Sequence, residues 1–347
     1  MNQSENLPTT SQVPPQAILL QMITGFWVSQ SVYVVTKLGI PDLLKQGSRH
    51  CDELATKTGT HSQSLYRVLR ALASVGLFEE TQSRCFQLTH LGTYLQSDVP
   101  GSLRAFTLMM GQEHLLPWNN LIHSVQTGEA AFEQQYGMDL FEYYRQNPEP
   151  GKIFEDAMTE FSVVAKAAVV EAYDFSGINQ VVDVGGGQGS LVAAILQKNP
   201  TMQGVVFDQP YLKENAQQLL EKEQVQDRCK FVGGDFFEEI FPGGDAYMLK
   251  HIVHDWDDDR AIAILQRCHQ AMSEQGRLLV IEQVIPPGNQ PFPGKFLDLN
   301  MLVATPGGRE RTAEEYRDLF QAAGFNLTRI VPTQSDVSVV EGVRITD

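Results

Sequence analysis

A glycine cluster between an apolar run and a helical pattern could bind a nucleotide-like ligand. Four of the five residues 185–189 are glycine, between the run 181–184 and a helical pattern at 191–198. Glycines allow positive φ, and the turn presents free N–H groups at a helix N-terminus. Asp208 ends the next apolar run, 19 residues after Gly189, where an acid would bind ribose hydroxyls. The pattern predicts a nucleoside-bearing cofactor, NAD or S-adenosylmethionine; the alternative is a glycine turn in another α/β sheet.

Two histidines follow a later apolar run. His251 and His254 are three residues apart, and on a strand that enters a loop this spacing is not helical. No cysteine or third histidine stands nearby in the sequence, so a metal site is disfavoured. Without the motifs that flank it, His254 would be interpreted as an ordinary solvated loop histidine. We expect the acids that follow to begin a helix, where the dipole favours them, rather than to bind a cation; they are Asp255, Asp257, Asp258 and Asp259.

The elements that must position these residues alternate between strand and helix. Strands are predicted at 180–185, 203–208, 229–234, 245–253, 277–285, 326–332 and 338–345, with helices between most of them. This alternation predicts an α/β fold with a Rossmann-like, seven-stranded sheet covered on both faces. The short gap at 333–337 fits a hairpin, which makes the final strand antiparallel.

Ligands bind at the carboxyl ends of the strands in such sheets. The third strand is followed by Asp235 and Phe236, a carboxylate and an aromatic ring suited to the edge and face of an adenine. Lys250 lies in the fourth predicted strand, and the fifth ends near Glu282. These four side chains are therefore expected at the same edge of the sheet as the glycine turn and Asp208.

The composition is that of a long, acidic chain. A length of 347 residues predicts two domains. The net charge of −16 and pI near 4.9 oppose a general role in binding nucleic acid or anionic membrane. The four scattered cysteines fit neither a disulfide framework nor a zinc site. Residues 1–14 are expected to be disordered and carry no signal pattern. Polar residues interrupt the best apolar run short of membrane length, so we expect a cytoplasmic protein.

The first hundred residues predict a helical module. Residues 17–37 have a helical pattern that is apolar almost all round, which requires cover from a partner subunit or from a core. Residues 51–80 fit helix, turn, helix, and a β ribbon follows, which is the outline of a winged helix. The second helix offers only Arg67 and Arg70, and the ribbon carries acids. A dimerisation scaffold is therefore favoured over a DNA-binding, ligand-sensing transcription factor.

Several motifs occur here in one order, at 183–187, 207–210, 234–237, 250–256 and 306–312. With them the chain resembles the S-adenosylmethionine-dependent small-molecule O-methyltransferases, which include plant caffeic acid and flavonoid enzymes, acetylserotonin methyltransferase and bacterial antibiotic-tailoring enzymes. The resemblance covers about residues 17–345. The helical pattern at 17–37, apolar on too many faces for the surface of a monomer, predicts a homodimer. We expect a tail, a winged-helix-like dimerisation domain, a helical acceptor-pocket segment and a catalytic domain at 1–14, 15–100, 101–175 and 176–347.

The resemblance implies cofactor-binding roles for Gly185, Gly187, Asp208, Asp235, Phe236 and Lys250. Gly185 would contact the methionine part of S-adenosylmethionine, and Asp208 the ribose hydroxyls. Asp235 and Phe236 would bracket the adenine, with Lys250 beside it. Phe236 stands where many plant members have Met, which exchanges one apolar adenine contact for another.

The resemblance also implies that His254 is a catalytic base, oriented by Glu282 and Glu310. A phenol with a pKa near ~10 is mostly neutral at pH 7, and a neutral imidazole can remove its proton as the methyl group transfers to oxygen. A carboxylate on the far ring nitrogen would fix the tautomer, and no metal is required. A sibling enzyme that methylates nitrogen stays open as an alternative. Candidates for the acceptor pocket, each of which could equally be core, are Met109, Met110, Trp118, Phe161, Asp298 and Met301.

Overall fold

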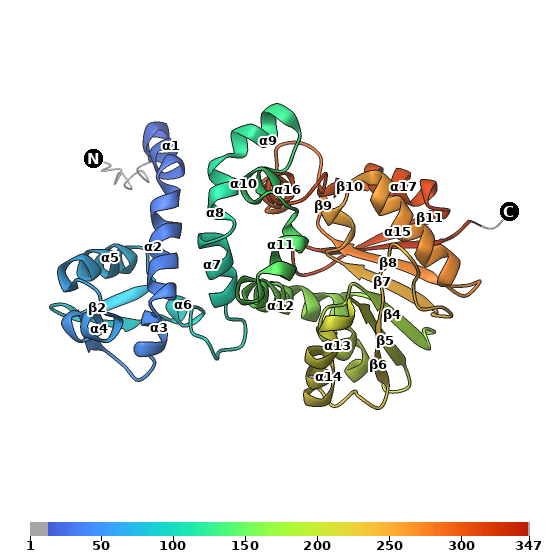
Figure 1. Ribbon diagram of the computed structural model, residues 1–347, viewed down its shortest axis with the longest axis horizontal. Coiled ribbons are helices and arrows are strands. Elements are labelled where there is room, and N and C mark those ends of the chain that lie inside the picture. The colour runs from blue at the N-terminus through green and yellow to red at the C-terminus, as the bar shows by residue number, and fades with distance from the viewer. Residues whose placement is uncertain (1–12, 346–347) are drawn as a thin grey trace, which may run out of the picture. The chain divides into compact units, whose positions relative to one another are not determined.

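The chain divides into two compact units, residues 1–111 and 112–347. The computed structural model describes residues 13–345, except for the side chain of Val164. The expected disordered tail, residues 1–14, therefore lies almost wholly outside the described residues. Figure 1 shows the first unit as helices with a small sheet and the second as a large sheet flanked by helices.

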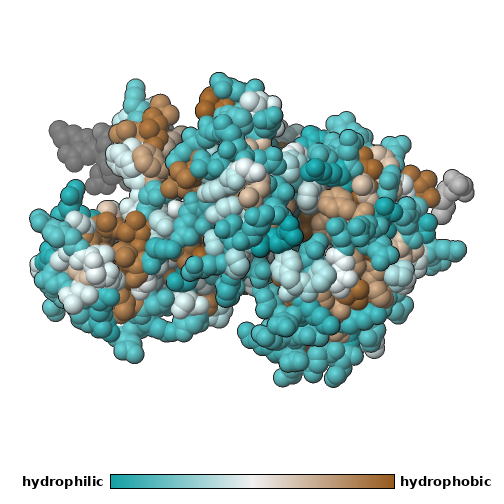
Figure 2. Space-filling view, in the orientation of Figure 1, coloured by the Kyte–Doolittle hydropathy of each residue, from teal (hydrophilic) through white to brown (hydrophobic). Residues whose placement is uncertain are grey.

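The first unit begins with two apolar helices, α1 (Pro15–Ile23) and α2 (Gly25–Lys37), where a single helix at 17–37 was expected. Thr24 separates them, and its hydroxyl donates to the carbonyl of Leu20. Of the described side chains, α1 buries none and α2 buries only Val35 and Thr36. The hydropathic view shows the apolar surface that results (Figure 2). Its large exposed side chains include Leu19, Leu20, Met22, Ile23, Phe26 and Trp27.

The stretch Pro15–Lys37 is also long and apolar enough to cross a membrane, judged by length and composition alone. Its best window has a mean hydropathy of 1.5 and is 6% buried. The expectation that no apolar run reaches membrane length was therefore wrong, because scattered polar residues lower the mean hydropathy too little. Soluble core helices and N-terminal signal sequences meet the same criterion, so this is weak evidence for a membrane span.

The rest of the first unit follows the predicted order of helix, turn, helix and ribbon. Strand β3 pairs with both β2 and β1 in an antiparallel sheet. Leu54, Leu69 and Phe86 are fully buried in its core. The elements are α3 (Ile40–Leu43), β1 (Arg49–His50), α4 (Cys51–Thr58), α5 (Ser62–Ser74), β2 (Phe78–Gln82), β3 (Cys85–Leu88), α6 (His90–Thr93) and α7 (Arg104–Gly111).

The second unit contains a seven-stranded sheet with the order β11-β12-β8-β7-β4-β5-β6. Strand β12 runs antiparallel to both β11 and β8, and the other pairs are parallel, so the predicted fold class is confirmed. The strands are β4 (Gln180–Val184), β5 (Gln203–Asp208), β6 (Cys229–Gly233), β7 (Ala246–Lys250), β8 (Arg277–Glu282), β11 (Phe325–Pro332) and β12 (Ser338–Arg344).

Helices cover both faces of this sheet, because successive strand side chains point to opposite faces. Val181 packs with α12, α13 and α14 on one face, and Val182 packs with α15 and α17 on the other. The helices of the unit are α8 (Leu115–Asn119), α9 (Leu121–Thr127), α10 (Ala131–Tyr136), α11 (Leu140–Gln146), α12 (Pro148–Ala172), α13 (Ser190–Lys198), α14 (Lys213–Lys222), α15 (Asp258–Ala271), α16 (Gly294–Ala304) and α17 (Ala313–Ala322), with 3₁₀ turns η1 (Pro210–Leu212) and η2 (Val253–Asp255).

Two strands end earlier than their apolar runs predicted. Strand β7 stops at Lys250, because His251 takes a left-handed backbone conformation with φ of 54°. The run expected at 277–285 splits after Glu282, and β9 (Val284–Ile285) pairs instead with β10 (Arg311–Thr312) in a separate parallel ladder. This ladder holds the segment just after Glu310 beside the segment just after Glu282.

Candidate active site

The glycine turn and Asp208 are joined by a hydrogen bond. Gly185 and Gly187 have φ of 67° and 59°, values that favour glycine. The Gly187 N–H donates to Oδ2 of Asp208 over 2.7 Å, and the Gln209 N–H donates to Oδ1 over 2.7 Å. Burial raises the pKa of Asp208, while these two N–H groups lower it. The carboxylate is held at the end of β5 with further lone pairs to offer to hydroxyl groups.

The loops after β4, β6 and β7 converge on Gly185. A Cβ there would clash with the side chain of Ile252 and would lie 3.7 Å from Cε1 of Phe236. Neighbouring Asp235 accepts a hydrogen bond from the Phe237 N–H over 2.8 Å. The structure thus brings Phe236 of the predicted adenine-binding pair and the loop before His254 to the glycine turn.

Lys250 interacts electrostatically with Asp183, a residue that the sequence analysis did not single out. Burial raises the pKa of Asp183 to about 7, and the charge of Lys250 opposes that shift. Burial likewise lowers the pKa of Lys250 to about 8, against the attraction of Asp183. The Lys250 Nζ donates to Oγ of Ser162 on α12 over 2.7 Å. The sequence could have indicated a partner for Asp183, because the residue lies inside an apolar strand and buried carboxylates are rare unless they are paired.

His254 is buried, and two glutamates contact it in different ways. Its Nδ1 lies 2.6 Å from Oε1 of Glu310. Glu282 binds the backbone: its Oε1 accepts the main-chain N–H groups of His254 and Ile252 over 3.1 and 3.2 Å. The Tyr316 hydroxyl donates to the other oxygen of Glu282. Glu310 therefore orients the imidazole, whereas Glu282 orients the backbone that carries it.

Acidic neighbours raise the proton affinity of His254. Burial alone would lower its pKa, but the charges of Glu310, Asp255 and Glu282 raise it to about 10. Oδ1 of Asp255 lies 3.6 Å from Nε2 of His254, and burial raises the pKa of Asp255 to about 7. The expectation that Asp255 belongs to a helix start was wrong. Asp257 caps α15 instead, by accepting the N–H of Arg260.

Arg311 holds the same loop from its carbonyl side. Its guanidinium is fully buried and donates to the carbonyls of Val253 and Trp256, each over 3.0 Å, and to Asp258 over 2.8 Å. Since Glu282 binds the N–H groups of this loop, the backbone around His254 is fixed on both sides. Arg311 belongs to the motif at 306–312, but the motif does not indicate which carbonyl groups the arginine binds.

Two acceptor-pocket candidates belong to α16, and one of them, Asp298, contacts Glu310. Oδ1 of Asp298 accepts the main-chain N–H of Glu310 over 2.9 Å, and Met301 is buried on the same helix, α16. The Trp118 indole donates to Asn300, also on α16, over 2.9 Å. Helix α16 therefore carries residues that reach both Glu310 and α8.

The remaining candidates lie elsewhere. Phe161 of α12 has its ring 5.8 Å from the ring of His251. Met109 and Met110 belong to α7 in the first unit, and only Met109 is among the buried core residues.

Two family models cover most of the chain. The O-methyltransferase domain matches residues 118–326, and the O-methyltransferase dimerisation domain matches residues 20–98. The chain belongs to the S-adenosylmethionine-dependent O-methyltransferases. The phenazine O-methyltransferase PhzM of Lysobacter antibioticus is 47% identical over 329 residues, which span 95% of this chain and 96% of that protein. The crystal structure of LaPhzM matches with a TM-score of 0.93 at 47% identity and covers 96% of this chain and 100% of that one.

More distant relatives of this O-methyltransferase include an N-methyltransferase and a protein solved with S-adenosylhomocysteine bound. The phenazine-1-carboxylate N-methyltransferase of Pseudomonas aeruginosa is 33% identical over 94% of this chain and 96% of its own. CalO1, a methyltransferase of calicheamicin biosynthesis, has a structure in its S-adenosylhomocysteine-bound form. That structure matches with a TM-score of 0.82 at 33% identity, over 96% of this chain and 100% of its own.

The residues at the glycine turn of this O-methyltransferase fit its cofactor chemically. Gly187 is open, since an added Cβ would have no atom within 4 Å, and the carboxylate of Asp208 stands beside it. Backbone N–H groups and an acid are what the hydroxyls and polar atoms of an S-adenosyl group require.

A possible cation-binding set also exists; it joins His254, which was weighed above as a metal ligand together with His251, to two glutamates that were not. Ligand atoms of His254, Glu282 and Glu310 lie within 4.8 Å of one another. Their hydrogen bonds already use them: Nδ1 pairs with Glu310, and both oxygens of Glu282 accept protein donors. A metal bound by all three would compete with the donors on Glu282, whereas Oε2 of Glu310 has no hydrogen-bond partner among residues 13–345.

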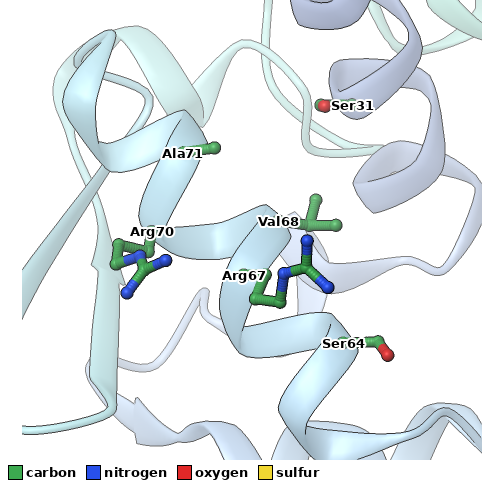
Figure 3. A pocket seen from close by; sticks show the side chains of 6 residues that line it. All are labelled: Ser31, Ser64, Arg67, Val68, Arg70 and Ala71. Carbon is green, nitrogen blue, oxygen red and sulfur yellow. The ribbon is translucent and has the colours of Figure 1, made fainter.

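The first unit carries a cavity of about 470 Å³, lined by Ser31 of α2 and by residues of α5 (Figure 3). None of the predicted site residues lines it. Arg67 and Arg70 do, and both are exposed. The lining residues are Ser31, Ser64, Arg67, Val68, Arg70 and Ala71.

Proposed function

We propose that this enzyme methylates an aryl hydroxyl of a small secondary metabolite, with His254 as the general base. The observation that carries the proposal is the buried pair of His254 and Glu310, on a loop whose Ile252 packs against the glycine turn. A phenazine hydroxyl is the first acceptor to test, because the relative from Lysobacter antibioticus is a phenazine O-methyltransferase.

The proposed proton transfer uses the far nitrogen of the imidazole. Nδ1 donates to Glu310, which leaves Nε2 with the lone pair that takes the hydroxyl proton. A phenol has a pKa near ~10, and the acidic neighbours raise the pKa of His254 to about 10. The raised proton affinity of His254 favours transfer of the phenol proton to it, and the imidazolium that forms is stabilised by Glu310. The cost is that little His254 is neutral at pH 7.

The cofactor in this proposal is held by the six residues that the resemblance implies. S-adenosylmethionine supplies a methyl group on a sulfonium, which any adjacent nucleophilic oxygen can attack. Asp208 binds the ribose, Asp235 and Phe236 bracket the adenine, and Lys250 lies beside it. Gly185 and Gly187 provide the main chain for the methionine part.

The proposal includes no catalytic metal, because the three candidate ligands already hydrogen-bond within the protein. Turnover is expected to be unchanged after dialysis against EDTA and after addition of Mg²⁺. If turnover is lost with EDTA and recovers with Mg²⁺, His254, Glu282 and Glu310 would instead be assigned as ligands of a cation.

We further propose a homodimer formed through the first unit. Its residues 20–98 match a dimerisation domain, and α1 and α2 expose side chains such as Met22 and Trp27 at 72% and 62%. Burying this surface against a second copy would remove it from water, which is favourable.

Nitrogen is the second candidate acceptor atom, favoured by the N-methyltransferase from Pseudomonas aeruginosa. An aromatic amine does not have to lose its proton before attack, so it has less need of a base. The test offers labelled S-adenosylmethionine with 1-hydroxyphenazine and with 1-aminophenazine, to wild type and to His254→Ala. Oxygen methylation that depends on His254 supports the proposal, and methylation of the amine alone overturns it.

A further inference from the structure

His251 has an unusual backbone at the end of β7. Its φ of 54° is one of three positive values found for non-glycine residues between 13 and 345. The other two are Arg84, in the turn between β2 and β3, and Gln224, just after the end of α14. Strained backbone of this kind is common where a side chain must be aimed at a ligand. The N–H of His251 still donates to the carbonyl of Ile281, over 3.3 Å, so the strand ladder holds the residue in place.

The ring of His251 has no hydrogen bond within the described chain. Both nitrogens are buried, and neither has a partner among residues 13–345. The ring lies 5.8 Å from that of Phe161 and 5.0 Å from that of His254, tilted by 33° from the latter. Buried polar groups in folded proteins nearly always have a partner, so an imidazole with two unpaired nitrogens beside the proposed base points to a ligand.

The surroundings of His251 keep it neutral. Burial lowers its pKa well below the usual range, and the positive charges of Lys250 and His254 lower it further. A neutral imidazole offers one N–H donor and one acceptor nitrogen. It therefore suits an uncharged polar atom and does not attract an anion as an imidazolium would.

We infer that His251 donates a hydrogen bond to a polar atom next to the reacting hydroxyl of the acceptor, such as a ring nitrogen beside that hydroxyl. This rests on the proposed function, in which the hydroxyl binds to Nε2 of His254. The two ring centroids lie 5.0 Å apart, so the rings can serve adjacent polar atoms on one edge of an aromatic acceptor. His251 would thereby select acceptors whose hydroxyl has such a neighbour.

The experiment compares two acceptors of the same shape. In 1-hydroxyphenazine a ring nitrogen lies beside the hydroxyl; 1-hydroxyanthracene has carbon there. Wild type is expected to prefer 1-hydroxyphenazine at least tenfold in kcat/KM, and in affinity when saturated with S-adenosylhomocysteine. His251→Phe keeps an aromatic ring without nitrogens and should lose this preference. His251→Asn tolerates the left-handed backbone, keeps a donor and should retain part of the preference.

Two controls separate acceptor recognition from folding and from cofactor binding. His269→Phe changes a histidine of α15 that packs against Phe325 and should behave as wild type. The affinity of His251→Phe for S-adenosylhomocysteine should be unchanged; a fall matching the loss of activity would make His251 a cofactor contact and overturn the inference. A melting curve would show whether His251→Phe binds S-adenosylhomocysteine poorly because it is unfolded. In that case the acceptor preference of His251→Asn, measured with the same two compounds, tests the inference.

The inference is overturned if folded His251→Phe still prefers 1-hydroxyphenazine to 1-hydroxyanthracene. It is also overturned if wild type shows no such preference or binds neither compound. These outcomes differ from failure of the proposed function. Equal, His254-dependent methylation of both hydroxyl compounds leaves the proposed function standing and removes only the role of His251. Methylation of aromatic amines alone removes the proposed function itself.

Discussion

Nδ1 of His254 and Oε1 of Glu310 lie 2.6 Å apart, and both side chains are buried. The second oxygen of Glu310 is also buried and has no hydrogen-bond partner among the described residues. The charge of this carboxylate is therefore directed mainly at the imidazole. In a setting with little water such a pair interacts more strongly than it would at the surface.

Replacing His254 with alanine should leave cofactor binding nearly intact and lower turnover by roughly two to four orders of magnitude, the usual contribution of a general base. The loss should shrink as the pH approaches that of the acceptor's own ionisation, because phenolate then forms without help. The measurement is turnover against pH with one identified aryl hydroxyl acceptor. Near-wild-type turnover at neutral pH would leave positioning alone to explain the reaction.

The fold was predictable because its signals are local. Alternating apolar runs placed all seven strands, and the short gap at 333–337 placed the hairpin of β11 and β12. The early end of β7 was not predictable, because Ile252 and Val253 continue the apolar run. The left-handed turn at His251 depends on the tertiary contacts around it.

The candidate site was predictable in its members but not in their contacts. The motifs named His254, Glu282 and Glu310 together, yet the sequence did not show that Glu282 binds the backbone through Ile252 and His254. Asp183 was passed over because one acid in an apolar strand says little without the neighbouring Lys250. Contacts across separate loops depend on three-dimensional packing, which spacing along a chain does not encode.

Asp208→Ala should abolish most of the thermal stabilisation by S-adenosylhomocysteine. A ligand that binds only the folded state stabilises it by RT ln(1 + [L]/Kd), so a weaker ligand shifts Tm less. Without ligand the variant should melt close to wild type, because the described hydrogen bonds of the Asp208 carboxylate are two, from the backbone N–H groups of Gly187 and Gln209. Thermal denaturation with and without the product checks this, and stabilisation by NADH in place of the product would contradict the cofactor assignment.

The enzyme should be a dimer at micromolar concentration. Charged substitutions in the exposed apolar face, Met22→Glu with Trp27→Glu, should release monomers, because burying unpaired charge in an interface is unfavourable. Light scattering measures the mass directly. A wild-type mass of about 38.7 kDa, that of one chain, would show that this face has another purpose.

Glu310→Gln should move the pH dependence of the reaction toward acid. In wild type the acidic neighbours raise the pKa of His254 to about 10, so the neutral base forms, and turnover rises, only as the pH approaches that value. Glutamine keeps the shape of the side chain but removes the negative charge closest to the ring. The pKa of His254 should fall, and the rising limb of the pH–rate profile should shift with it.

The plateau of the Glu310→Gln profile should also be lower, since the imidazolium that forms during the reaction loses its stabilising carboxylate.

The free energy of unfolding gives an independent test of the His254–Glu310 pair, and its pH dependence has a defined sign. A histidine whose pKa is raised by folding stabilises the protein fully below its unfolded pKa of ~6.5, and that stabilisation is lost as the pH rises through the folded value. Wild type should therefore exceed Glu310→Gln in free energy of unfolding most at pH 6 and least near pH 10. Glu133→Gln, on α10 and outside the predicted site, is the control for a change of one charge. A constant difference across this range would show that His254 does not owe its proton affinity to Glu310.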